Sequence, residues 1–216
     1  MKWWQIGLGV GVAGLGIFAF TRTAAAASPS SGGEEDEEDG QTASGGVDFN
    51  KPLEPYTERR VAVADYASLK SDDPRLEPVP GQAGKKLHWR AVDGFIALEK
   101  AAGAAGFTKL RIASAWRKPA YPTYEAYEKA MIAKYGSVAE GRKWKAFASP
   151  HETGLGLDFG SQGLEPKRAT IATQLKSPFF AWLRANAYKY GWAPYKKEPW
   201  HWEFPIPPAE FKESRT

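Results

Sequence analysis

The pattern of apolar and polar residues divides the chain into three parts. Residues 1–23 contain an apolar stretch of eighteen residues in which only Gln5 is polar, and this length is just enough to cross a bilayer core. Residues 24–50 have almost no large apolar side chain and include six consecutive acidic residues, so they cannot offset the entropy lost on folding. We therefore predict a hydrophobic helix over 1–23, a flexible linker over 24–50 and a folded domain over 51–216.

Two interpretations of the hydrophobic segment stay open. Trp3 and Trp4 suit a membrane interface and favour an uncleaved anchor. Alanines spaced as A-x-A before Ser28 offer a signal-peptidase site and favour a cleaved export signal. Either way, we expect the folded domain to lie across the membrane from the cytoplasm.

Within the domain, apolar spacing of about 3.6 residues predicts helices and alternation predicts strands. Helices are expected over 87–106, 123–136, 138–147 and 177–191, and strands over 108–116, 154–160 and 200–204. Strands scattered among helices without a regular βαβ order are typical of an α+β domain.

Charge and cysteine content restrict the chemistry. From Lys51 onward the chain has 27 Lys and Arg against 18 Asp and Glu, which suits an anionic partner or simply keeps the domain soluble. Export and the lack of a nucleic-acid-binding motif argue against nucleic acid. The chain has no cysteine, so disulfides, thiolate metal sites and a cysteine nucleophile are excluded. A metal would have to be bound by His and carboxylates.

Two short stretches bring such residues together. His151 and Asp158 are seven positions apart across a glycine-rich turn, and Glu198 precedes His201 by three positions. Two imidazoles and one carboxylate suit catalytic zinc, which keeps a fourth position for water. The spare carboxylate can accept a proton from that water.

These stretches resemble a known family. The pattern S-x-H-x-x-G-x-x-x-D from Ser149 to Asp158, followed by E-P-W-H at 198–201, is similar to zinc D,D-peptidases of the VanY and VanX type. That family trims D-Ala-D-Ala ends of cell-wall peptides, and related members are L-Ala-D-Glu endopeptidases. Gly156 stands where the family usually has alanine. The run 114–118, SAWRK, looks like the family's Ser-Gly-Tyr-Arg-Ser, although the glutamine that often follows has no counterpart here.

The resemblance covers about residues 87–204 and implies a small, mostly antiparallel central sheet with flanking helices, as in Hedgehog and D,D-peptidase domains. It also implies hydrolysis of peptidoglycan stem peptides by an exported monomer in the bacterial cell envelope, either membrane-anchored or periplasmic or extracellular. The implied site consists of one Zn²⁺ per chain bound by His151, Asp158 and His201, with Glu198 as general base, Arg117 as a catalytic, substrate-holding group and Ser149 as a further substrate contact.

Several alternatives remain at the level of sequence. Ser149 could instead cap the local turn. Glu203 shares a strand face with His201, so it could orient this ligand or replace Glu198 as the base. We expect His88 to be structural or on the surface, and Glu152 to be solvated. For function, the leading expectation is a D-alanyl-D-alanine carboxypeptidase; the alternatives are an L-Ala-D-Glu endopeptidase and a catalytically inactive wall-binding module.

Overall fold

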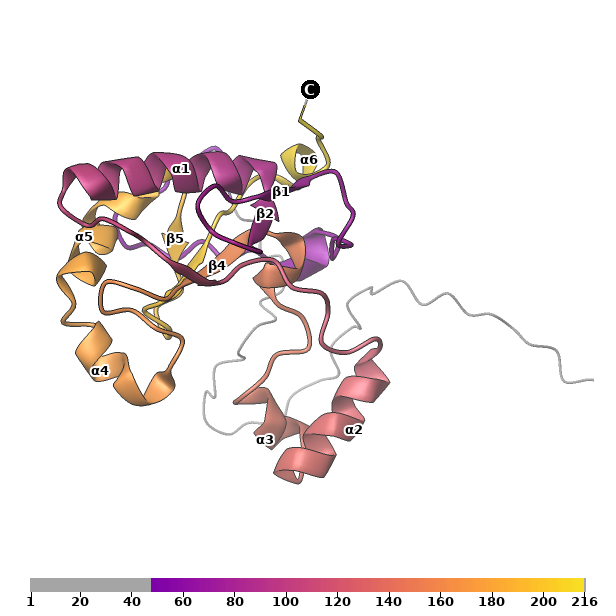
Figure 1. Ribbon diagram of the computed structural model, residues 1–216. Helices are drawn as coiled ribbons and strands as arrows, with labels where there is room; N and C mark the ends of the chain where they lie inside the picture. The colour runs from indigo at the N-terminus through magenta and orange to yellow at the C-terminus, as the bar shows by residue number, and fades with distance from the viewer. Residues whose placement is uncertain (1–47, 216) are drawn as a thin grey trace, which may run out of the picture.

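The computed structural model describes residues 48–215 (Figure 1). The hydrophobic segment predicted over 1–23 lies outside the described residues, as do all but the last three residues of the predicted linker. Among the helices of the described part, none is both long enough and apolar enough to span a bilayer.

The strands of the described residues form two antiparallel sheets. The larger has the order β3-β4-β6-β5, and the smaller pairs β1 with β2. The strands are β1 (Leu76–Pro78), β2 (Lys86–His88), β3 (Ile112–Ser114), β4 (Gly156–Phe159), β5 (Ala193–Pro194) and β6 (His201–Glu203). The predicted α+β class with a small antiparallel sheet and flanking helices is confirmed.

The helices are α1 (Trp89–Ala104), α2 (Tyr124–Tyr135), α3 (Val138–Arg142), α4 (Ile171–Gln174), α5 (Pro178–Asn186) and α6 (Pro208–Phe211), with 3-10 turns η1 (Val63–Asp65), η2 (Pro150–Thr153), η3 (Arg168–Thr170) and η4 (Ala187–Tyr190). The helix predicted over 138–147 is wrong beyond Arg142, where the backbone N–H of Trp144 bonds the carbonyl of Gly141 in a tighter turn. Strands β1, β2 and β5 and helices α4 and α6 were not predicted, because two to four residues are too few to set a period.

One face of the larger sheet packs into the core, and the other face carries the candidate metal ligand Asp158. Side chains alternate along a strand, so Leu157 and Phe159 of β4 enter the core while Asp158 points the opposite way. All four residues of β4 are buried. Helix α1 places Phe95 and Leu98 in the same core. The packing of the core against this sheet therefore fixes the position of the Asp158 side chain on the opposite face.

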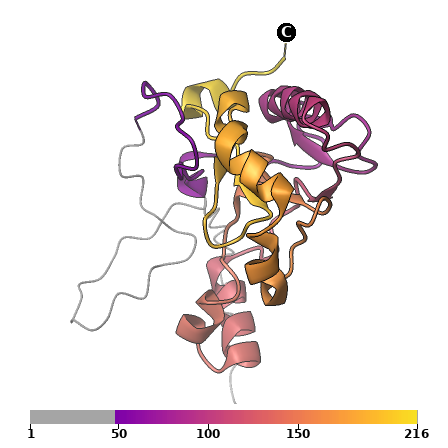
Figure 2. The ribbon, with the colours of Figure 1, turned by 90° about the vertical axis from the view of Figure 1, so that its left-hand side faces the viewer.

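Helices α2 and α3 form a separate projection, which we call the arm (residues 119–147). In Figures 1 and 2 the arm extends from the end of the body opposite α1. Its buried side chains Tyr127 and Met131 do not belong to the main core. The two helices approach closely at Gly141, where an added Cβ would lie 2.6 Å from Met131. The arm thus has a small core of its own.

Candidate metal centre

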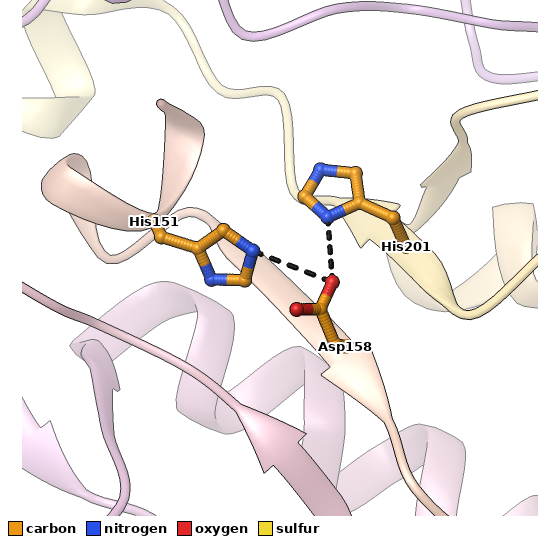
Figure 3. Close-up of side chains that lie close together, drawn as sticks. All are labelled: His151, Asp158 and His201. Atoms are coloured by element: carbon orange, nitrogen blue, oxygen red, sulfur yellow. Dashed lines mark hydrogen bonds and ion pairs between the residues drawn. The ribbon is translucent and has the colours of Figure 1, made fainter. Parts of the chain in front are cut away.

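Three neighbouring elements bring the predicted ligands together. Asp158 of β4 pairs in register with Ser114 of β3 on one side and with His201 of β6 on the other. His151 comes from η2, just before β4, and the chain turns between them at Gly154, whose φ is +74°. Figure 3 shows both imidazole rings directed at the Asp158 carboxylate.

The geometry of this cluster is compact. Asp158 Oδ1 lies 2.8 Å from His201 Nδ1 and 3.3 Å from His151 Nε2. The candidate ligand atoms all lie within 4.8 Å of one another, and all three residues are buried. Charged groups buried away from solvent in this way are paired with one another or coordinate a metal ion.

The hydrogen bonds at the far sides of the rings fix which nitrogen faces the centre. His151 Nδ1 lies 2.8 Å from the carbonyl oxygen of Ala115 and donates to it, so Nε2 keeps its lone pair. His201 Nε2 donates to Glu203 Oε1 at 3.2 Å, and its Nδ1 faces Asp158 Oδ1 at 2.8 Å, where a metal ion would take the place of the Nδ1 proton. Partners of this kind hold metal-binding imidazoles in the required tautomer.

The electrostatics of the cluster favour a cation. Burial alone would raise the pKa of Asp158, but His151 and His201 outweigh it and hold that pKa well below its usual range. Burial alone would lower the pKa of His201, yet Asp158 and Glu203 raise it to about 9. The two carboxylates therefore stay ionised on either side of one ring, and they attract positive charge to it.

The donor set fits zinc. Zinc accepts imidazole nitrogen and carboxylate oxygen at about 2.0–2.2 Å in tetrahedral sites, which sets ligand atoms about 3.3 Å apart. The distances from Asp158 Oδ1 to the two ring nitrogens, 2.8 and 3.3 Å, are close to such an edge. Three protein ligands leave a fourth position for water or substrate.

Glu198 lies beside this cluster. It belongs to the turn between β5 and β6, in which the N–H of His201 donates to the Glu198 carbonyl at 2.8 Å. Its side chain lines the same pocket of about 240 Å³ as the three candidate ligands. Arg168 forms an ion pair with Glu198 Oε1 at 3.1 Å, which holds the carboxylate at the rim.

Arg117 and Ser149 lie on the same pocket and contact each other. The Arg117 guanidinium donates to Ser149 Oγ at 3.2 Å. Ser149 occupies the residue before η2, but its side chain makes no capping hydrogen bond there, so the alternative role as a turn cap is wrong. An exposed guanidinium next to a hydroxyl can bind a carboxylate or a carbonyl oxygen.

Two other expectations are settled by burial. Glu152 was expected to be solvated; that prediction is wrong, because its residue is 3% exposed and Ser68 Oγ donates to its Oε2 at 2.8 Å. His88 is structural: it is fully buried, its Nδ1 accepts from Arg90 N at the start of α1, and its Nε2 contacts the Phe211 carbonyl.

Sequence reasoning missed three residues of the site. Arg60 and Arg168 line the pocket and pair with Glu203 and Glu198, and Tyr195 packs edge-on against His201. None of them stands at a motif spacing from the ligands, so no signal in the sequence could have identified them.

One protein-family model and several solved structures are similar to this chain. A model of the VanY family, described as D-alanyl-D-alanine carboxypeptidase, matches residues 84–207. No curated protein sequence matches the chain. Similar solved structures include the LD-carboxypeptidase LdcB, described for peptidoglycan recognition, at 24% identity, 60% coverage of this chain and 67% of that chain, and a TM-score of 0.43.

Two further structures are VanYB in complex with D-alanine-D-alanine (23% identity, 62% of this chain, 78% of that chain, TM-score 0.42) and a variant of the vancomycin-resistance D,D-pentapeptidase VanY with Zn(II) (21%, 62%, 80%, TM-score 0.40). The family model spans more than half of the chain and includes every candidate ligand. The chain therefore belongs to the VanY family of D-alanyl-D-alanine carboxypeptidases.

Proposed function

We propose that this protein is a zinc-dependent D-alanyl-D-alanine carboxypeptidase that acts on peptidoglycan stem peptides. The observation that carries the proposal is the cluster of His151, Asp158 and His201, in which one nitrogen of each imidazole ring is held towards the same carboxylate oxygen. When bound, zinc would supply a Lewis acid that polarises the scissile carbonyl and makes water acidic enough to be deprotonated near neutral pH.

The chain's own residues supply the proton transfer. Glu198 is 21% exposed at the rim of the pocket, where it can reach both water and the substrate. Its carboxylate accepts the proton of the attacking water and delivers it to the leaving nitrogen. Glu203 is unsuited to this step, because it is fully buried and both its oxygens already accept from other groups.

The substrate's end is recognised by Arg117 and Ser149. A carboxypeptidase must bind a free terminal carboxylate, and a guanidinium paired with a hydroxyl offers charge and directed donors for it. The contact between Arg117 and Ser149 at 3.2 Å forms such a pair on the pocket that holds the candidate ligands. This pair favours a carboxypeptidase over an endopeptidase, whose substrate has no terminal carboxylate at the cleaved bond.

A digest with metal control tests the proposal. The full chain is loaded with zinc and incubated with two synthetic stem peptides, one ending in D-Ala-D-Ala and one with that terminus amidated. We expect loss of one D-alanine from the free acid, little cleavage of the amide, and no activity after chelation until zinc is restored. Equal cleavage of both peptides at an internal bond would identify an endopeptidase. Zinc binding without any cleavage would favour a wall-binding module.

We further propose that residues 1–23 carry the domain across the cytoplasmic membrane of a bacterial cell, because wall peptides lie outside it. The apolar stretch and its flanking residues support this step. We expect activity from a reporter enzyme that works only outside the cytoplasm when it is fused after residue 216. The mass of the mature chain distinguishes an anchor from a cleaved signal. A reporter active only in the cytoplasm would refute the proposal.

A further inference from the structure

A segment that precedes the family-matched region contacts Glu203, the residue behind the candidate ligand His201. Residues 56–66, which we call the strap, lie before the match over 84–207. They contact the carboxylate of Glu203, which is the hydrogen-bond acceptor of His201. Nothing in the predicted zinc motifs points to this segment, because it is more than 130 residues away from His201 in sequence.

The strap supplies two of the partners of Glu203. The backbone N–H of Val61 donates to Oε2 at 2.6 Å, and Arg60 Nε forms an ion pair with Oε1 at 2.8 Å. His201 Nε2 donates to the same Oε1 at 3.2 Å. Glu203 is fully buried. Removing the positive charge of Arg60 would leave the Glu203 carboxylate away from solvent with fewer compensating partners, and a poorly compensated buried charge costs free energy of folding.

Arg60 is itself held in place. Its guanidinium carbon lies 3.8 Å from the centre of the Tyr195 ring, and Tyr195 in turn packs edge-on against His201. Arg60 therefore reaches the same ligand by two routes, one through the Glu203 carboxylate and one through the Tyr195 ring. Stacking on an aromatic ring restricts the guanidinium to one orientation.

The strap is held against the rest of the domain on both sides of Arg60. Tyr56 packs edge-on against Phe180 with centroids 5.9 Å apart, and Glu58 Oε1 accepts from the backbone N–H of Lys196 at 2.7 Å. On the other side the Tyr66 hydroxyl donates to the carbonyl of Ile206. These contacts fix the strap on α5 and around strand β6, so Arg60 is presented to Glu203 by a built structure.

We propose that Arg60 is a positioning residue of the metal centre, acting through Glu203 to hold His201 in its zinc-binding orientation. The strap would then be a functional part of this domain, although it lies before the residues that the family model matches. This inference rests on the proposed zinc function. It predicts that zinc affinity depends on a residue that is not itself a candidate ligand.

The matched pair for a test is Arg60 and Arg59. Both are partly exposed arginines of the strap, but Arg59 donates to the carbonyls of Lys51 and Pro52 and makes no contact with Glu203. We expect Arg60→Gln in the full chain to weaken zinc binding by roughly 10–100-fold, the usual effect of losing a group that orients a ligand. Arg59→Gln should leave the affinity near that of wild type.

Zinc affinity is measured by competition with a fluorescent zinc chelator, and thermal unfolding of the metal-free proteins is recorded beside it. Arg60→Lys keeps the charge but has a methylene where Nε contacts Glu203, so we expect a smaller loss. If Arg60→Gln does not fold, the zinc affinity of Arg60→Lys is compared with that of Arg59→Lys instead. Equal zinc affinities within the deciding pair would overturn the proposal.

A double-mutant cycle separates action through Glu203 from general support. If Arg60 acts through Glu203, then Arg60→Gln should cost little further affinity in a Glu203→Gln background. Full additivity would overturn the proposed route. Failure of wild-type protein to bind zinc at all would instead refute the zinc function itself, so the two failures are distinguishable.

Discussion

The body and the arm meet at the same pocket but are built in different ways. In the body, Asp158 and His201 stand on adjacent strands and His151 on the turn η2 just before β4, and the other face of the sheet is packed into the main core. The arm contributes Tyr121, Trp144 and Phe147 to the pocket from a helical hairpin with a small separate core. Trp144 is 55% exposed.

This difference separates two requirements of a hydrolase. A metal centre needs ligands fixed in position, since small displacements cost affinity and rate. Substrate recognition tolerates, and often uses, segments with few packing contacts, because such segments open locally at low cost in free energy. We therefore expect substitutions in the body to alter metal binding and overall stability, and substitutions in the arm to alter substrate binding.

The largest expected effect belongs to Glu198, which lies where the two parts meet. Glu198→Gln removes the proton acceptor but preserves size and most hydrogen bonding. Loss of a general base typically costs on the order of 10²–10⁴ in rate, so kcat should fall by this amount. Zinc content, measured by metal analysis, should not change, because Glu198 is not among the clustered ligands.

Two further variants serve as comparisons for Glu198→Gln. Asp158→Asn should weaken zinc binding itself, because the charge of a ligand is lost. Glu140→Gln, an exposed carboxylate of the arm, should leave both kcat and zinc unchanged. Should Glu198→Gln retain wild-type activity while Glu203→Gln is inactive with zinc bound, the base would be Glu203.

The next largest effect concerns Glu203, the carboxylate on the buried side of the same centre. Glu203→Gln keeps a hydrogen-bonding group near His201 but removes the charge that fixes its ring. We expect a loss of roughly 10–100-fold in zinc affinity, with kcat close to that of wild type once the site is saturated. Titration of activity with zinc checks this, and a drop in kcat at saturating zinc would contradict it.

These two glutamates also show what the sequence could and could not establish. Two short motifs, Ser149 to Asp158 and Glu198 to His201, carried the resemblance that placed His151, Asp158 and His201 together, and the structure brings these three side chains into one cluster. The choice between Glu198 and Glu203 did not follow from the sequence, since both lie near His201 and only burial separates them: one is at the pocket rim and the other has no exposed surface.

The rest of the site depends on contacts between distant segments. Arg60 meets Glu203, and Arg168 meets Glu198, across 143 and 30 residues, and no periodicity encodes such pairs. The same holds for β1 and β2, whose three-residue length gave no alternation to detect. Helix α1 was predicted to within two residues at each end because its apolar spacing is sustained.

A pair of glycine substitutions compares the two cores directly. An added Cβ at Gly94 of α1 would lie 2.3 Å from the Phe204 ring and 2.9 Å from the Tyr190 carbonyl oxygen, and one at Gly141 of α3 would lie 2.6 Å from Met131. Overpacking of this kind costs about 1–3 kcal/mol. Gly94→Ala should therefore lower the midpoint of global thermal unfolding and the zinc affinity together.

Gly141→Ala should act only on the arm. We expect faster amide hydrogen exchange in α2 and α3 and a higher KM for the stem peptide, with unchanged zinc affinity. Gly103→Ala is the control, because an added Cβ there meets no atom within 4 Å and it lies in the same helix as Gly94. A loss of zinc affinity in Gly141→Ala would show that the arm and the body are coupled more tightly than their separate cores indicate.

The smallest effect is the response of the body to acid, through the histidine that is not a ligand. Burial lowers the pKa of His88 to about 4, against 6.5 for the exposed side chain, despite the opposing hydrogen bond to Phe211. Between these values the unfolded chain binds a proton that the folded protein does not, so stability falls as the pH falls. From pH 7.5 to 5.5 this group should cost about 1.4 kcal/mol.

Replacing His88 by asparagine isolates that contribution. Asparagine can still accept from Arg90 N at the start of α1 but does not titrate. His88→Asn should be less stable at pH 7.5, since the contact with the Phe211 carbonyl is lost, yet its unfolding free energy should decline less towards pH 5.5. Urea denaturation of both proteins at the two pH values measures this, because the other titratable groups are the same in both proteins and their contributions cancel. Parallel declines would mean that His88 takes up its proton in the folded protein as readily as in the unfolded chain.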